Sequence, residues 1–187
     1  QAWSPADLFA PCGGDCAVAL YGGDYVENSM GEVLVTDPEL PFTWDYQEDH
    51  FIGTAISRDV GQLWRFRLEP EVGIGQRFGQ QSATEVWGAL FFRYRGFPWD
   101  DVVTTTIAFS TGLNWASEVT AIEQERAKDG EGSQVMHFFS PEVTLALPQA
   151  PDVELMFRFH HRSGVFGIVS DAFGGAQYGT VGLRVRF

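Results

Sequence analysis

Basic residues are scarce in this chain of 187 residues. Lys and Arg number 12 against 25 Asp and Glu, which gives a net charge of -13 at pH 7. Without a basic run, the chain is not expected to bind nucleic acid. The sequence also lacks any apolar run of the roughly 20 residues that a membrane-spanning helix needs. It is not a disordered acidic chain, because 44% of its residues are hydrophobic and 14% are aromatic.

Cysteine is nearly absent as well. The two that occur, Cys12 and Cys16, lie in a Cys-Gly-Gly-Asp-Cys run. An oxidising compartment would join them in a disulfide. The alternative is a pair of free or metal-binding thiols, although two ligands are too few for a structural zinc site. The chain begins at Gln1 without a leader sequence, so we interpret it as an exported product whose signal has been removed.

Apolar and polar residues alternate along most of the chain, as they do in strands with two different faces. Residues 178–187 read Tyr-Gly-Thr-Val-Gly-Leu-Arg-Val-Arg-Phe, and comparable segments begin near residues 16, 50, 63, 86, 103, 135 and 153. The sequence therefore predicts eight strands. A closing strand that ends in an aromatic residue, here Phe187, resembles the last strand of bacterial outer-membrane barrels.

The charges on the polar face decide between a β-sandwich and a barrel. In a soluble sandwich the apolar face forms the core and the charged face meets water. Here Arg and Glu occur near the middle of long strands, where in a barrel they would pair in the lumen. We therefore predict an all-β fold, an eight-stranded antiparallel transmembrane β-barrel with a lumen that side chains can fill. Four phenylalanines are expected to face lipid and four arginines the lumen: Phe66, Phe92, Phe109 and Phe157 against Arg65, Arg67, Arg93 and Arg158.

The links between the strands alternate in expected length. Short links are predicted at 58–62, 96–102 and 148–152, and longer ones at 28–49, 77–85, 116–133 and 164–177. This alternation is typical of the short periplasmic turns and longer extracellular loops of outer-membrane barrels. We accordingly divide the chain into a periplasmic N-terminal tail, residues 1–15, and a barrel in the bacterial outer membrane, residues 16–187.

A polar pair interrupts the apolar face of the strand that begins near residue 153. Residues two apart on a strand share a face, so His161 and Ser163 continue its lipid-facing row near the extracellular end. Polar side chains are costly there unless they have a function. Nucleophilic acyl transfer needs a hydroxyl beside a base that a third group orients. Ser163 and His161 supply the first two groups, and Asp171 is the one side-chain carboxylate that follows Ser163.

This His-x-Ser at the top of a strand, followed by one loop and a closing strand, resembles the lipid A 3-O-deacylase (PagL-type) family of outer-membrane barrels. The resemblance implies an esterase that hydrolyses an ester-linked acyl chain of lipid A, with Ser163 as nucleophile, His161 as general base and no cofactor. The family commonly has Asn directly after the serine to hold the oxyanion. This chain has Gly164 there, whose N–H would substitute. The family's acid is a Glu further along the chain, and Asp171 is nearer to the serine.

Two alternatives stay open at the level of sequence. His161 and Ser163 could be interfacial residues that meet lipid headgroups, in a non-catalytic structural barrel or a barrel subunit of a larger outer-membrane assembly. The acidic loops and the N-terminal tail would then bind protein partners, whereas the esterase would bind lipid A of the outer-leaflet lipopolysaccharide. His160, on the opposite face, is expected to be a hydrogen-bonded lumen residue. His50 and His137 lie on other strands with no cysteine nearby, so no metal site is expected.

Overall fold

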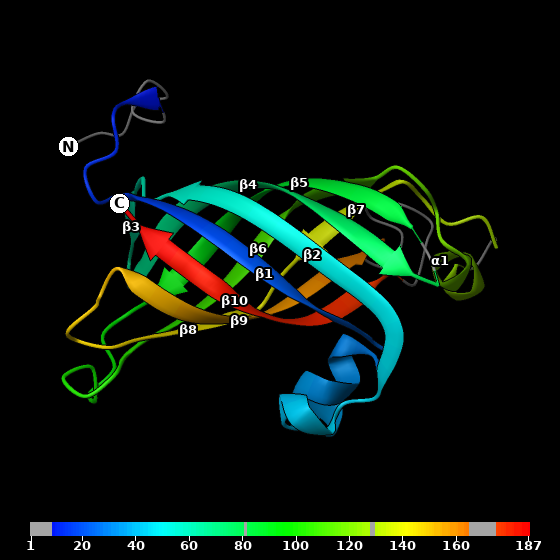
Figure 1. The fold of residues 1–187 in the computed structure, drawn as a ribbon, viewed down its shortest axis with the longest axis horizontal. Coiled ribbons are helices and arrows are strands. Elements are labelled where there is room, and N and C mark those ends of the chain that lie inside the picture. Colours follow the sequence, from blue (N-terminus) through cyan, green and yellow to red (C-terminus); the bar gives the residue numbers. More distant parts are fainter. Residues whose placement is uncertain (1–8, 81, 128–129, 165–174) are drawn as a thin grey trace.

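The structure is a computed structural model that describes residues 9–80, 82–127, 130–164 and 175–187. These residues form ten strands, one α-helix and two short helical segments (Figure 1). The strands are β1 (Cys16–Val26), β2 (Tyr46–Arg58), β3 (Gly61–Leu63), β4 (Phe66–Gly79), β5 (Ala83–Tyr94), β6 (Thr104–Ala116), β7 (Val135–Phe139), β8 (Glu142–Ala146), β9 (Val153–Ser163) and β10 (Gln177–Arg186). The helical elements are η2 (Glu32–Thr36), η3 (Pro41–Thr43) and α1 (Ala121–Arg126). None of the helices in the described ranges is long and apolar enough to cross a membrane.

The strands close into an antiparallel barrel. β10 pairs with both β1 and β9, and the wall continues from β1 through β2, β4 and β5 to β6. β7 and β8 lie end to end between β6 and β9, so together they form one strand of the wall that Ser140 and Pro141 interrupt. β3 only extends a hairpin with β4. The wall therefore has eight strands, and the predicted eight-stranded antiparallel barrel is confirmed.

Side chains alternate between the two faces of the wall. Most charged residues in the middle of the strands point inward, and Arg93 and Arg158 are among those that are buried. Large apolar side chains point outward and are exposed; Phe109, for example, is 40% exposed. We call these outward residues the apolar belt: Val18, Leu20, Ile52, Ile56, Val72, Ile74, Val86, Ile107, Phe109, Leu113, Val143, Leu155, Phe157, Val181 and Leu183. An apolar exterior around a charged interior is the arrangement of a transmembrane barrel.

Ion pairs fill the lumen. Arg158 contacts Glu71 at 2.8 Å and Glu142 at 2.5 Å. Arg93 contacts the same Glu142 at 2.6 Å and Glu69 at 2.8 Å. All five side chains are buried. Buried charges are tolerated when each has an opposite charge and further hydrogen bonds nearby, so this network is what allows the strands to carry charges inward.

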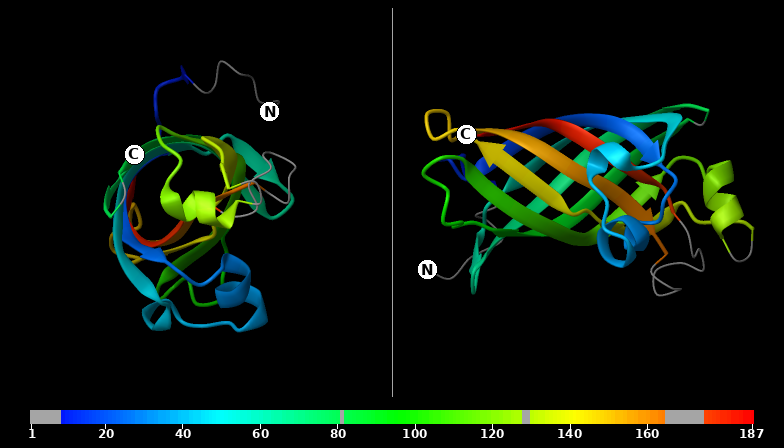
Figure 2. Two further views of the ribbon diagram at one scale, coloured as in Figure 1. Left: turned by 90° about the vertical axis from the view of Figure 1, so that its right-hand side faces the viewer. Right: turned by 90° about the horizontal axis from the view of Figure 1, so that it is seen from below.

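Three charged residues differ from the sequence expectation. Arg65 lies in the turn between β3 and β4, where it is exposed and donates to the Tyr94 hydroxyl at 3.0 Å, so it does not face the lumen. Arg77, expected in a loop, lies in β4 and is buried in the lumen. Glu123 of α1 is also buried there and contacts Arg77 at 3.3 Å and Arg162 at 3.5 Å. Helix α1 accordingly lies across one mouth of the barrel (Figure 2, left).

The start of β1 and the end of β10 lie at the opposite mouth, where Cys16 and Phe187 exchange backbone hydrogen bonds. The links 59–65, 95–103 and 147–152 also lie at this end, whereas the facing ends of β1 and β2, of β4 and β5, of β6 and β7, and of β9 and β10 lie at the α1 end. The prediction of a long link at 77–85 is therefore wrong, because β4 and β5 extend into this range and pair Arg77 with Ala83. The other three links at the α1 end are long, as expected.

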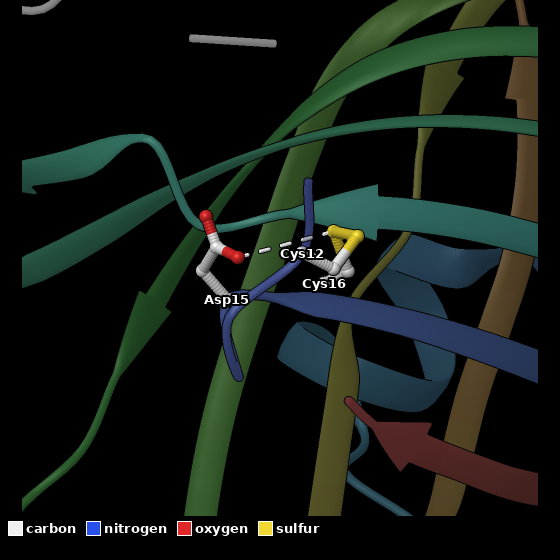
Figure 3. A group of neighbouring side chains, drawn as sticks. All are labelled: Cys12, Asp15 and Cys16. Atoms are coloured by element: carbon white, nitrogen blue, oxygen red, sulfur yellow. Dashed lines mark hydrogen bonds between the residues drawn. A yellow bond between two sulfur atoms is a disulfide. The ribbon is translucent and has the colours of Figure 1, made fainter. Parts of the chain in front are cut away.

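The described part of the N-terminal tail, residues 9–15, precedes β1 and lies outside the wall (Figure 1). The predicted disulfide joins Cys12 and Cys16, whose Cα atoms are 5.6 Å apart (Figure 3). Asp15 lies beside the disulfide and forms an ion pair with Arg58 of β2 at 2.7 Å. Arg58 also donates to two backbone carbonyls of the tail, which ties the tail to the barrel. Because both sulfurs are in the disulfide, this group of residues offers no thiolate to a metal ion.

Candidate functional site

Two polar residues end the outward row of β9. His161 and Ser163 share this face with Leu155 and Phe157, and both are half-buried, whereas the inward Arg162 between them is fully buried. β9 ends at the mouth of the barrel that carries α1 (Figure 1), and the pair lies at that end of the strand. The structure thus places the pair on the face and at the end of the strand that the sequence indicates.

The imidazole of His161 stacks on the ring of Phe159, with 6.3 Å between ring centroids. On the other side, the β9–β10 ladder pairs His161 with Gln177. Its Nδ1 atom is buried and has no hydrogen-bond partner within the described part of the chain. Asp171, the expected third member of the site, lies outside the described residues, so its role stays a prediction.

A second histidine lies beside Ser163. The β7–β9 ladder pairs Ser163 directly with His137, which is also half-buried. The Nε2 atom of His137 is 2.8 Å from Oγ1 of Thr111 on the next strand, β6. Alternation alone places His137 on the outward face of its strand. Its position opposite Ser163 depends on strand register, which the local pattern does not carry, and for that reason it was missed as a site residue.

Glycine lets the backbone that enters β10 lie close to Ser163. A Cβ atom at Gly175 would overlap the carbonyl of Arg162 and lie 3.0 Å from the Cα atom of Ser163. The N–H of Arg162 donates to the carbonyl of Ala176 at 3.0 Å. Gly164 is buried directly after Ser163, and its expected part in holding an oxyanion stays a prediction. The backbone on which Ser163 lies is therefore packed between two neighbouring strands.

A helical segment covers the outer wall next to His161. η2 and η3 lie outside the barrel (Figure 2, right), and Trp44 packs edge-on onto Phe159 with 5.2 Å between ring centroids. Val33 joins this contact, and Phe159 is only 4% exposed although it points outward. On the β6 side, by contrast, Leu113 is 55% exposed. The wall is thus covered on one side of the polar pair and exposed on the other.

His160, which points inward, has a structural role. Its Nδ1 atom is 3.2 Å from the Tyr21 hydroxyl, and its Nε2 atom is 3.0 Å from the Glu85 carboxylate. The rings of Phe51 and Phe138 enclose it, at centroid distances of 4.3 and 4.9 Å. The expectation that His160 is a hydrogen-bonded lumen residue is confirmed, and this histidine is separated from Ser163 by the barrel wall.

No protein-family model matches the chain, and neither does any curated protein. Its fold is similar to that of solved β-barrels. The crystal structure of the outer membrane enzyme PagL matches with a TM-score of 0.57 and 13% identity, over 91% of this chain and 99% of that chain. A de novo designed transmembrane β-barrel matches with a TM-score of 0.55 and 11% identity, over 95% and 98%. Neisserial surface protein A (NspA) matches with a TM-score of 0.52 and 12% identity, over 95% and 100%. At these identities the likeness establishes the fold of an eight-stranded transmembrane barrel.

Proposed function

We propose that this protein is an outer-membrane esterase that hydrolyses an ester-linked acyl chain of lipid A. The observation that carries the proposal is the outward-facing pair of His161 and Ser163 at the end of an otherwise apolar row. The acyl ester of a membrane lipid lies near the membrane surface, with its chain directed toward the bilayer centre. A nucleophile at this position would therefore meet the ester without removing the lipid from the membrane.

The pair supplies the groups that ester hydrolysis needs. His161 would take the proton of Ser163 as its Oγ attacks the acyl carbonyl carbon. The carbonyl electron pair moves to the oxygen, which the N–H of Gly164 would hold. Collapse of this intermediate breaks the ester bond, and His161 returns the proton to the departing alcohol. Water then attacks the acyl-enzyme and releases the fatty acid. Asp171 would orient His161 through Nδ1, the ring atom that lacks a described partner.

The exterior of the barrel supports insertion into a membrane. Aromatic side chains gather at both rims of the apolar belt, as in known outer-membrane barrels. Phe97 and Trp99 stack at 5.0 Å near one mouth, and Trp44 and Tyr46 lie 6.3 Å apart near the other. We place the α1 mouth at the outer leaflet of the bacterial outer membrane, where Ser163 would reach lipid A of lipopolysaccharide. The tail, residues 1–15, is then periplasmic.

Release of fatty acid tests the proposal. Purified barrel in detergent is incubated with lipopolysaccharide, and lipid A from cells with and without the chain is compared by mass spectrometry. Ser163→Ala should lower fatty-acid release by about 10³-fold or more. The barrel should stay folded, because a hydroxyl at the end of a strand contributes nothing to the backbone ladder. His161→Ala should behave alike.

A matched control is His50→Ala. His50 is an outward histidine on β2, three strands away from β9, where it pairs with Asp24 at 2.6 Å. Its loss should leave fatty-acid release unchanged. Equal release by the wild type and Ser163→Ala would contradict the esterase.

A non-catalytic barrel is the second candidate function. The fold is similar to that of Neisserial surface protein A and of designed barrels as well, and the base of the proposed pair has no described orienting acid. In this case the acidic loops and the N-terminal tail would be protein-binding surfaces in a larger outer-membrane assembly. A folded wild-type protein that releases no fatty acid from any lipid A would favour this candidate.

A further inference from the structure

His137 shares an outward surface with the polar pair of β9. It is directly opposite Ser163 in the β7–β9 ladder. Residues directly opposed in an antiparallel ladder point to the same face, with Cβ atoms about 4.5–5.5 Å apart. His161 lies two residues along the same strand from Ser163, a backbone distance of roughly 6.5 Å. Ser163 therefore has a histidine neighbour on each of two sides, and the backbone of His137, across the ladder, is nearer to it than that of His161.

The ring of His137 contacts Thr111 on β6. The Thr111 hydroxyl is 2.8 Å from Nε2 of His137. When this hydroxyl donates, Nε2 is the acceptor and the proton of the neutral ring lies on Nδ1. His137 then carries an N–H donor on Nδ1 rather than a second base. Thr111 is flanked on the outward face of β6 by the exposed Phe109 and Leu113, so Thr111 and His137 interrupt an apolar surface. Such an interruption is costly for a purely structural wall.

We propose that His137 is a further catalytic residue, whose Nδ1–H donates a hydrogen bond to the oxyanion; this inference rests on the proposed esterase function. In the step concerned, Oγ of Ser163 bonds to the acyl carbon and its proton passes to His161. The carbonyl π pair moves to the oxygen, where His137 donates a hydrogen bond and keeps its proton. When the ester bond breaks, the leaving alkoxide takes the proton from His161. Gly164 can supply only a backbone N–H, so a side chain from β7 completes a pair of donors.

Two substitutions distinguish a hydrogen-bond donor from a base. His137→Ala should lower kcat for fatty-acid release from lipopolysaccharide by roughly 10²–10³-fold with little change in KM, the loss typical of one oxyanion donor. His137→Asn places an amide N–H near the position of Nδ1 but takes up no proton, so it should recover most of that loss. His50→Ala is the control, because His50 is also half-buried at this end of the barrel. An unchanged kcat in His137→Ala, or an Asn variant no better than the Ala variant, would overturn the inference.

A fluorophosphonate probe makes the test independent of the lipid. Oγ of Ser163 would bond to phosphorus, fluoride would leave, the serine proton would pass to His161, and the phosphonyl oxygen would take the place of the oxyanion. Intact-mass measurement on the purified barrel should show slower labelling in His137→Ala, recovery in His137→Asn and none in Ser163→Ala. If the wild type labels in this way yet releases no fatty acid from lipopolysaccharide, the lipid A substrate is wrong and the role of His137 stands. If Ser163 is not labelled, or is labelled equally fast in His137→Ala, the inference fails.

Discussion

Replacing Gly73 by alanine would place a methyl group against the indole ring of Trp87 in the lumen. Gly73 of β4 pairs with Trp87 of β5 across the ladder. A Cβ atom at Gly73 would overlap Cζ2 and Cε2 of Trp87 and lie 2.8 Å from its Nε1 atom. The indole is held in place, because Nε1 donates to Glu71 at 3.0 Å and the ring stacks on Phe138 at 5.7 Å. The added methyl must therefore displace a side chain that has little freedom to move.

The expected cost follows from these contacts. Overpacking a filled interior costs about 1–3 kcal/mol, and weakening the bond from Trp87 to the charged Glu71 would add up to about 1.5 kcal/mol. Gly73→Ala should thus lower the free energy of unfolding by about 1–4.5 kcal/mol. Gly88→Ala is the matched control, because nothing lies within 4 Å of a Cβ atom there. Alanine at Gly88 should be neutral or stabilise the barrel by up to about 1 kcal/mol.

Equilibrium unfolding in denaturant, with the barrel folded into lipid vesicles, measures this difference. Tryptophan fluorescence and the heat-dependent mobility of the folded barrel in gels give two probes of one transition. In a double-mutant cycle, Gly73→Ala and Trp87→Phe should be less than additive, since the smaller ring leaves room for the methyl group. Equal stability of the Gly73→Ala and Gly88→Ala proteins, or strict additivity in the cycle, would refute the argument.

The same unfolding assay tests the two faces of the wall. Phe157→Arg puts a charge into the apolar belt near the middle of β9 and should destabilise the barrel by about 2–4 kcal/mol in vesicles. Phe157→Leu is its control, and equal stability of the two would contradict a lipid-facing position. Arg158→Met leaves Glu71 and Glu142 without a shared guanidinium group, and it should cost about 3–5 kcal/mol. Adding Glu71→Gln should recover part of this loss, whereas a fully stable Arg158→Met protein would show that the ion pairs do not hold the lumen together.

The barrel was predictable because each strand carries a signal on both of its faces. Apolar residues at every second position mark the exterior, and arginines and glutamates between them mark the lumen. The prediction was wrong at 77–85, where Arg77 was taken for part of a loop. Its partners are Glu85 on the next strand and Glu123 on α1. These partners come close to Arg77 only in the folded barrel, so the sequence alone does not distinguish Arg77 from an arginine in a solvent-exposed loop.

Only those residues of the candidate site that lie on one strand could be predicted from the sequence. His161 and Ser163 have a fixed spacing along β9, so alternation is enough to place both on one face. His137 and Gly175 come to Ser163 from β7 and from the start of β10, and their positions depend on the register of separate strands. Register is set by the pairing of whole strands and by the packing of the lumen, so no short pattern in the sequence contains it.

The filled lumen explains why chemistry is expected on the outside of this barrel. Each of six buried glutamates contacts at least one arginine: Glu69, Glu71, Glu85, Glu123, Glu142 and Glu154. Their charges are therefore engaged in holding the strands together, and α1 lies across one mouth. On the outward face, His161 keeps a ring nitrogen without a described partner, and Ser163 is half-buried beside it. The apolar belt next to His161 and Ser163 contacts the lipid chains of the membrane. A lipid acyl chain that is already in the membrane can therefore reach Ser163 without first being transferred out of water.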